Sequence, residues 1–219
     1  MIANEKSAAD THREDILRAA VEVFGREGYA AASTNEIVKQ AKVSKGLLFH
    51  YFTNKEKLYT ACLLNVMESY GKYMVRHMDL SSPDLFERIL SNLRIKMAYG
   101  CANKEFLALI NRAWHLEGEE NPLARPEAVD HVVQQMEGQP GSLAEALEMT
   151  FFKGLDTSLF RDGVEPAKVI DYIGLALEAG WFRFTQRHHG DIDAIVRDMD
   201  SYISEAEDII MLMKCGAYK

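Results

Sequence analysis

The chain has 219 residues, enough for one large domain or two small ones, and 47% of them are hydrophobic. That hydrophobic share is ample for a packed core and excludes a disordered chain. The formal net charge of −8 excludes a protein that coats nucleic acid through a generally basic surface.

The acidic excess lies beyond residue 60. Residues 1–60 contain nine Lys or Arg and eight Asp or Glu, whereas the remainder contains sixteen and twenty-five. A basic recognition face on an acidic body would bind DNA in one orientation and repel it elsewhere, with an affinity that depends strongly on salt.

Neither a membrane nor an oxidising compartment is indicated. No apolar run is long enough to span a bilayer, and residues 1–15 lack the apolar core of a signal peptide. The cysteines Cys62, Cys101 and Cys215 are widely spaced, without a CxxC or zinc pattern, so we expect reduced thiols and assign them no role. We therefore expect a cytoplasmic protein with no membrane partner.

The first predicted helix covers residues 11–27, after a short polar arm that we expect to be frayed. Its apolar residues recur at the spacing of one buried helix face: Ile16, Ala20, Val23 and Phe24. Gly28 marks its end.

Residues 34–57 predict two short helices joined by a turn. Thr34 has the side chain to cap the first helix, whose inward face is formed by Ile37 and Ala41. Ser44 can cap the second helix, which has a buried stripe and a different, outward side. The stripe consists of Leu48 and Phe52, and the outward side of Lys45, Phe49 and His50.

A third helix follows the pair, opened by a capping box over residues 53–56. Lys55 then lies in its first turn, where the helix dipole favours acidic residues. The lysine at this position therefore indicates an interaction other than with the helix dipole. Between residues 39 and 57 there are five lysines against the single acid Glu56, a balance of +4 before His50 is counted. This positive local charge favours binding of a polyanion.

At these residues the chain resembles the DNA-binding head of the TetR family of bacterial transcription regulators. The resemblance covers roughly residues 12–60 and is carried by the strings EDILRAAVEVFGREGYAAAST, EIVKQAKVSKGLLFHYF and NKEKLY. It implies an all-α protein with an N-terminal three-helix helix-turn-helix head, residues 1–54. A long helix would join this head to a helical ligand-binding and dimerisation body, residues 55–219.

The resemblance also implies which residues meet DNA. In the family the positions of Thr34 and Ser44 cap the helix pair and touch phosphates, and residues of the second helix enter the major groove. The DNA-binding residues predicted in this way are Thr34, Ser44, Lys45, Gly46, Leu47, Phe49, His50, Tyr51 and Lys55.

Three residues depart from the family pattern. Lys42 stands where the turn usually has Gly, so either Lys42 is strained or the turn differs. Phe49 replaces the usual Tyr and lacks the hydroxyl that would bond a phosphate. Leu47 stands where small or polar residues are common, and it either contacts a thymine methyl group or packs internally.

The rest of the chain is predicted to be helical, and no segment has the pattern of a strand. A helix over about residues 55–77 is too long to belong only to the head, which makes it the mechanical link between the domains. The other predicted helices lie near residues 81–100, 103–117, weakly 127–137, 142–160, 166–188 and 192–214.

The body of TetR-like proteins usually encloses a ligand cavity, and this part of the chain is rich in Met and aromatic residues. The candidates for the cavity wall are Met67, Met74, Met97, Phe106, Trp114, Phe151 and Trp181. For each of them plain core packing is at least as good an explanation. If the cavity forms, its ligand should be mainly apolar, because few charges interrupt these stripes.

Dimerisation is predicted through residues 166–188 and 192–214, because both helices carry more apolar surface than one helix face hides. Two such helices from each subunit would form a four-helix bundle around a twofold axis. In this bundle small residues let the backbones approach and β-branched residues fill the seam. The predicted interface residues are Gly174, Gly180, Ile203 and Ile210.

The predicted function is a TetR-like repressor that binds a pseudo-palindromic operator as a dimer and is released by a small ligand. An activator or an effector-free regulator with the same head remains an alternative. An enzyme is disfavoured, because there is no HExxH, glycine-rich phosphate loop or GxSxG, so we expect no catalytic residue, cofactor or metal. The nearest metal-like groups, His115 with Glu117 and His188 and His189 with Asp191, are better explained as solvated residues.

Overall fold

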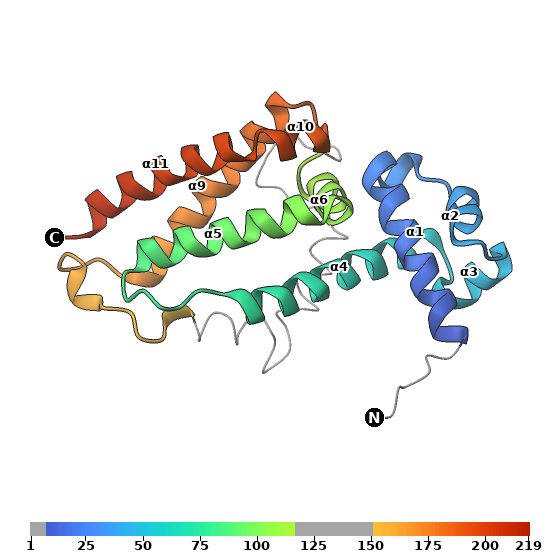
Figure 1. The fold of residues 1–219 in the computed structure, drawn as a ribbon, viewed down its shortest axis with the longest axis horizontal. Coiled ribbons are helices and arrows are strands. Elements are labelled where there is room, and N and C mark those ends of the chain that lie inside the picture. Colours follow the sequence, from blue (N-terminus) through green and yellow to red (C-terminus); the bar gives the residue numbers. More distant parts are fainter. Residues whose placement is uncertain (1–7, 117–150) are drawn as a thin grey trace. The chain divides into compact units, whose positions relative to one another are not determined.

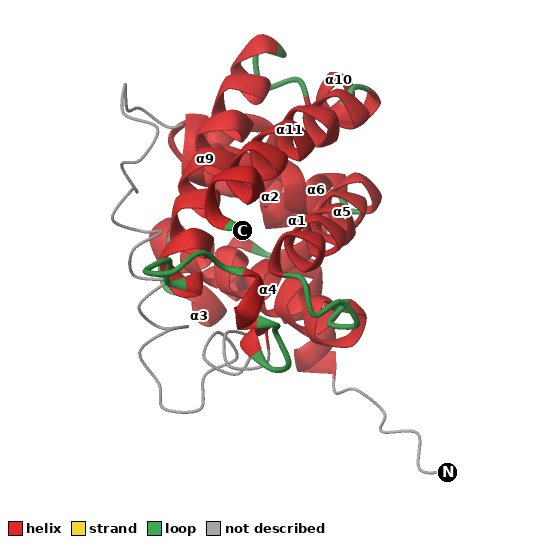
Figure 2. Cartoon of the chain, turned by 90° about the vertical axis from the view of Figure 1, so that its left-hand side faces the viewer, coloured by secondary structure: helices red, strands yellow, loops and turns green. Residues whose placement is uncertain are grey.

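The computed structural model describes residues 8–116 and 151–219. Within these residues the regular structure is helical, apart from an isolated antiparallel bridge between Phe160 and Tyr218 (Figure 2). The predicted all-α class is therefore confirmed. No helix in this part of the chain is long and apolar enough to cross a membrane.

The described residues form two compact units (Figure 1). The head unit comprises residues 8–69 and 104–116, and the body unit comprises residues 70–103 and 151–219. Helix α4, Lys55–His77, has the bounds that the sequence predicts and contributes to both units. The predicted division at residue 54 remains a proposal. Helix α6, which follows residue 54 in the chain, packs in the head unit.

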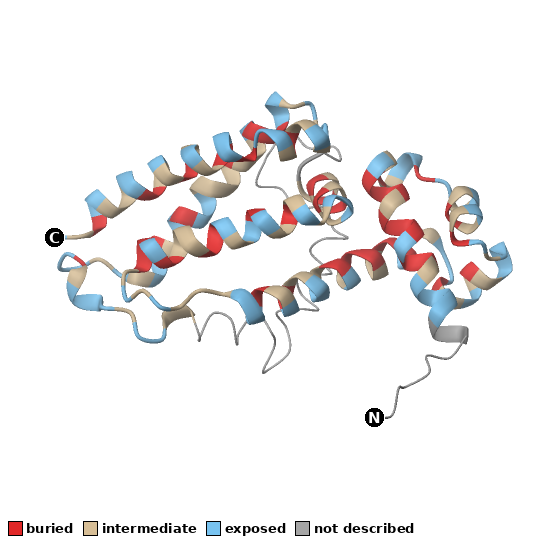
Figure 3. Ribbon diagram, viewed as in Figure 1, coloured by how far each residue is buried: buried red, intermediate tan, exposed pale blue. Residues whose placement is uncertain are grey.

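The head unit is built around α1, Ala8–Ala31. Its predicted apolar face is fully or almost fully buried, and this burial holds the unit together (Figure 3). Gly28 interrupts the helix with a φ of 78°, in the left-handed region where the sequence places the end of the helix. The other helices of the unit are α2 (Thr34–Ala41), α3 (Lys45–Phe52), the first part of α4, α6 (Lys104–Asn111) and the π-helical η1 (Arg112–Leu116).

Helix α6 lies so close to α1 at Gly25 that a larger residue there would require the neighbouring atoms to shift by a few tenths of an ångström. A Cβ added to Gly25 would come within 3.1 Å of the Ala108 Cβ and 3.2 Å of the Leu109 nitrogen. The guanidinium of Arg112 donates to the carbonyl oxygens of Gly25, at 3.1 Å, and Arg26, at 2.8 Å. These bonds satisfy carbonyls near the point where α1 is interrupted.

The body unit contains the end of α4, helix α5 (Leu85–Ala102) and a pair of long packed helices, α9 (Pro166–Arg187) and α11 (Met199–Ala217). A Cβ on Gly180 would contact the Ile209 side chain at 3.6 Å, and Arg183 pairs with Glu205 at 3.1 Å. Rising residue numbers on α9 therefore meet falling numbers on α11, so the two helices are antiparallel.

Two predicted helices differ in the structure, one in its end and the other in its continuity. The helix expected over residues 142–160 lies partly outside the described residues, and in the described part it ends at Phe152, before a turn in which Gly154 has a φ of 77°. The short 3-10 helix η2, Thr157–Leu159, follows. The helix expected over residues 192–214 is interrupted at Asp198 and consists of α10, Ile192–Arg197, and α11. The weak helix expected at 127–137 lies outside the described residues.

Arg88 of α5 is buried, with 2% of its surface exposed. Its guanidinium donates five hydrogen bonds, all to backbone carbonyl oxygens: one to Leu80, two to Ser82, one to Phe151 and one to Lys153. A guanidinium has five N–H donors, so one side chain ties the segment before α5 to the segment that begins at residue 151.

Candidate nucleic-acid interface

Helix α2 is capped one residue earlier than the sequence indicates. Ser33 has extended backbone angles, and its hydroxyl accepts a hydrogen bond from the Asn35 N–H at 3.3 Å. Thr34 is the first helical residue instead. Ile37 and Ala41 form the buried face, as predicted.

Helix α3 has the two sides that the sequence predicts. Ser44 caps it, accepting from the Leu47 N–H at 3.1 Å, while Leu48 and Phe52 are buried. The outward residues are open to solvent, with Lys45, Gly46 and His50 exposed and Leu47, Phe49 and Tyr51 half-buried. A Cβ on Gly46 would meet only the Ser44 hydroxyl, at 3.9 Å, so another molecule can approach the backbone closely.

The start of α4 differs from the predicted capping box. Thr53 has a φ of 63°, and the cap is Asn54, whose side-chain oxygen accepts from the Lys57 N–H at 2.8 Å. Lys55 lies beside α1: its ammonium donates to the Ala30 carbonyl at 3.1 Å and lies 4.9 Å from the centre of the Tyr29 ring. These contacts give Lys55 a structural use at a helix start, and its phosphate contact remains a proposal.

Several acids of the head are already occupied by partners within it. Arg26 pairs with Glu27 at 2.8 Å and also with Glu36, and its hydrogen bond lowers the pKa of Glu27. Glu22 accepts a hydrogen bond from Gln40. By contrast, the cations near α3 face solvent: Lys39, Lys42, Lys45 and Lys57 are exposed. The basic balance expected around α3 is therefore available to a polyanion.

The turn between α2 and α3 is of the ordinary left-handed type, and Lys42 adopts it with φ 55° and ψ 38°. Its N–H bonds to the Lys39 carbonyl, and the Val43 N–H bonds to the Val38 carbonyl, in the manner of a helix C-cap. Of the two explanations that the sequence left open, the structure favours a strained Lys42 over an altered turn.

Lys42→Gly should therefore raise the free energy of unfolding by about 0.5–1 kcal/mol. The left-handed conformation costs a non-glycine residue about 1–2 kcal/mol, and the greater freedom of glycine in the unfolded chain offsets part of this. Urea unfolding measures the change. Lys42→Ala, which removes the same cation but keeps the strained φ, is the matched control and should not be stabilised; equal gains for both variants would contradict the strain.

The residues predicted to line a ligand cavity are divided between the two units. Met67, Phe106 and Trp114 are half-buried in the head unit. In the body unit, Met74 and Met97 are buried and Phe151 and Trp181 half-buried. The Trp181 ring packs on those of Phe184, at 5.7 Å, and Tyr202, at 5.0 Å, which gives it a core role as well. A shared ligand site for these seven residues remains a proposal.

Two of the predicted interface residues are buried within the protomer, and the predicted interface itself stays a prediction. Ile210 is buried, with 4% exposed, and Gly180 is buried against Ile209 and Tyr202, in the packing of α9 on α11. Ile203 is half-buried. Gly174 is exposed, and a Cβ added to it would meet no other described atom within 4 Å. The exposed large apolar side chains of these helices are different residues: Tyr172, Leu175, Met211 and Leu212.

The histidines at the end of α9 have structural surroundings. His188 is hydrogen-bonded through Nε2 to Asp198 at 3.0 Å, and Asp191 caps α10 by accepting from two backbone N–H groups. The His115 side chain and Glu117 lie outside the described residues. Of the thiols, Cys62 is buried, and burial raises its pKa, whereas Cys215 is exposed.

A capped short helix with a basic outward side, held on a three-helix core, defines a helix-turn-helix DNA-binding domain. Residues 16–62 match the model of the bacterial regulatory proteins of the TetR family. The repressor NicS of Pseudomonas putida is 34% identical over 77 residues, which are 35% of this chain and 36% of NicS. The N-terminal part of the chain is therefore similar to the DNA-binding domain of TetR family regulators, and its match spans about a third of this curated relative.

Solved structures extend the likeness in fold beyond the head. A TetR family transcription regulator from Shewanella sp. PV-4 superposes with a TM-score of 0.61 at 18% identity, covering 95% of this chain and 98% of that one. The regulator FadR of Bacillus subtilis, in complex with stearoyl-CoA, gives a TM-score of 0.60 at 15% identity, with 93% and 98% covered. The fold of the body is thus that of TetR regulators.

Proposed function

We propose that the protein is a repressor that binds a pseudo-palindromic operator as a homodimer and leaves it when a small, mainly apolar molecule binds the body. The outward side of α3 is the observation that carries the proposal. Lys45, Gly46 and His50 are exposed on a helix whose other side is anchored by Leu48 and Phe52. A short helix held rigidly in this way suits a major groove about 12 Å wide.

Each predicted DNA contact has a distinct role in this proposal. Lys45, the first residue of α3, reads a guanine edge, and Leu47 meets a thymine methyl group. Thr34 and Ser44 lie at helix N-termini, where backbone N–H groups and the helix dipole favour phosphate. Phe49, His50, Tyr51 and Lys55 complete the surface, with Lys55 on the phosphate side.

The exposed apolar residues of α9 and α11 support the dimer. Because these helices are antiparallel and Gly180 lies beside Ile209, Leu175 comes to the level of residue 214, within one turn of Met211 and Leu212. Leu175 is 51% exposed, Met211 60% and Leu212 74%, so the two helices share an unpaired apolar strip. A second copy of the same strip would cover it around a twofold axis.

The ligand part of the proposal rests on the body. Its fold is shared with a regulator whose solved structure holds stearoyl-CoA, a molecule with a long apolar chain. The Met and aromatic side chains predicted for the cavity wall suit such a chain.

Lys45→Ala should weaken binding to an operator selected from a random duplex library by ~1–3 kcal/mol, with a smaller effect on unrelated duplexes, because Lys45 reads a base. Lys55→Ala is the companion variant. It should weaken binding on all sequences alike and lower the slope of log affinity against log salt by ~1, one phosphate contact. Fluorescence anisotropy over a range of salt concentrations measures both.

Equal losses from Lys45→Ala on selected and unrelated DNA would assign Lys45 to phosphate. An unchanged salt slope in Lys55→Ala would leave Lys55 with only its bond to Ala30. Failure of the wild-type protein to select any sequence would overturn the DNA-binding proposal itself.

A further inference from the structure

The head unit has a groove between α1, α4 and α6, and none of the predicted DNA contacts lines it. Its volume is about 460 Å³, within the range of sites that hold small molecules. Its apolar lining consists of Leu17 and Val21 of α1 and Val66 of α4, all buried. The groove therefore offers a small molecule an apolar surface that the packing of the helices already holds in place.

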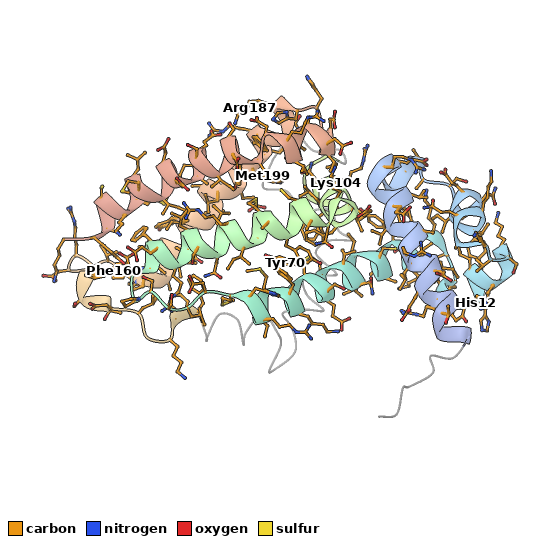
Figure 4. The ribbon with its side chains drawn as sticks, in the orientation of Figure 1. His12, Tyr70, Lys104, Phe160, Arg187 and Met199 are labelled. Atoms are coloured by element: carbon orange, nitrogen blue, oxygen red, sulfur yellow. The ribbon has the colours of Figure 1, made fainter. Side chains whose placement is uncertain are left out.

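The groove runs along α1, with α4 and α6 bordering different parts of it. The thiol of Cys62, one turn before Val66 on α4, donates to the Leu17 carbonyl at 3.9 Å, so α4 borders the part nearer the start of α1. A Cβ on Gly25 would lie 3.5 Å from the backbone oxygen of Glu105, so α6 borders the part nearer Gly25. Figure 4 labels Lys104, the residue before Glu105, at the start of α6.

Carboxylates lie toward both ends of this groove. Glu14 lines it nearer the start of α1, whereas Glu22 of α1 and Glu105 of α6 line it near Gly25. Glu14 and Glu22 are eight residues apart, which is about 12 Å along a helix axis. Glu22 accepts a hydrogen bond from the uncharged amide of Gln40, and the exposed Glu105 carboxylate has no hydrogen bond or ion pair within the described part of the chain.

One cation, Arg18 of α1, also lines the groove between the two ends. Its guanidinium pairs at 2.8 Å with Asp15, which lies outside the groove lining. Three carboxylates and one guanidinium leave the lining with a formal charge of −2. This charge favours an organic cation and disfavours an anion.

We propose that the groove binds a linear aliphatic diamine, with one ammonium at Glu14, the other at Glu22 and Glu105, and the chain against Leu17 and Val21. An ammonium has three donors and a carboxylate only accepts, so each end of the diamine meets suitable partners. A monoamine would leave the carboxylates at one end without a cation. The site goes beyond the proposed function, because it lies in the head unit and is separate from the effector response of the body.

Calorimetry on the full chain at low ionic strength compares 1,8-diaminooctane with octylamine, 1,8-octanediol and 1,3-diaminopropane. The long diamine should bind about three- to fivefold more tightly than octylamine, the contribution of one ion pair at a partly exposed site, and the diol should bind more weakly still. The short diamine has the same charge but cannot reach both ends of the groove. It therefore measures the general attraction of a dication to a chain of net charge −8, and it should bind more weakly than the long diamine.

Three variants of the groove test the residues. Glu105→Gln and Glu14→Gln should each lower the affinity for 1,8-diaminooctane about three- to fivefold, and Arg18→Gln, which removes the cation from the lining, should raise it. Glu56→Gln is the matched control, because it removes an exposed carboxylate of α4 outside the groove, and it should bind as the wild type does. Bound diamine should also raise the midpoint of thermal unfolding of the wild type by mass action.

Two results overturn the inference. Equal affinities for the long and short diamines in the wild type, or equal losses in Glu105→Gln and Glu56→Gln, would show only a general attraction between a dication and an acidic protein. No binding of 1,8-diaminooctane would remove the site outright. Neither result bears on operator binding or on the effector response of the body, and the comparison of the two diamines needs no variant to fold.

Discussion

Leu212→Asp should convert the protein into a folded monomer whose operator affinity is lowered by about 10²–10⁴-fold, the range that tethering two binding modules contributes. Leu212 is 74% exposed in the protomer, so a carboxylate there stays in water when the chain is alone. In the proposed dimer the same carboxylate would be buried without a partner, which is costly. The head is untouched, so any loss of affinity reports the lost second head.

Sedimentation velocity at micromolar concentration, with operator binding on the same samples, measures the effect. Val75→Asp is the matched control, because Val75 is also an exposed apolar residue, at 53%, but lies on α4. It should remain dimeric with unchanged operator affinity. A monomeric wild type, or a Leu212→Asp variant that associates as the wild type does, would show that the strip on α9 and α11 is not the interface.

The periodicity of apolar residues predicted the helices well because it is set by local geometry. The bounds of α4, and the buried residues of α1, α2 and α3, follow from spacing alone. The caps were displaced by one residue because two adjacent side chains are able to cap: Ser33 beside Thr34, and Asn54 beside Thr53. The backbone decides between them, and the φ of 63° at Thr53 places that residue at the end of α3 instead.

Residues whose roles depend on distant parts of the chain could not be read from the sequence. Lys55 bonds to Ala30, 25 residues away, so its local charge pattern indicates DNA and says nothing of α1. On α11 the predicted interface residue Ile210 is covered within the protomer. Sequence spacing does not distinguish such a covered residue from the exposed residues beside it, Met211 and Leu212, because the difference depends on how the other helices pack.

Arg88 is the strongest case of a long-range role, and Arg88→Met should lower the free energy of unfolding of the body unit by ~3–5 kcal/mol. Its five hydrogen bonds reach carbonyls six to eight residues before it and 63 to 65 residues after it. Bonds to a charged group contribute ~1.5–3 kcal/mol each, and buried carbonyls left without partners add their desolvation cost. Methionine is similar in length to arginine but has no hydrogen-bond donors. Water that reaches the freed carbonyl oxygens recovers part of the lost hydrogen-bond energy, so the expected change is smaller than the sum over the five bonds.

The measurement follows the fluorescence of Trp181, which lies in the body unit, during urea unfolding in a Trp114→Phe background that removes the chain's second tryptophan. The matched control is Arg94→Met on the same helix, which removes a pair whose side chains are 55% and 38% exposed. Exposed pairs contribute about 0–1 kcal/mol, so this variant should remain close to the wild type. The stability of Arg88→Lys should lie between those of the wild type and Arg88→Met. An ammonium has three donors and lacks the planar guanidinium geometry, so it cannot bond to all four carbonyl oxygens. If Arg88→Met unfolds no more easily than Arg94→Met, the carbonyls are satisfied without the guanidinium, and the two segments it joins are held by other contacts.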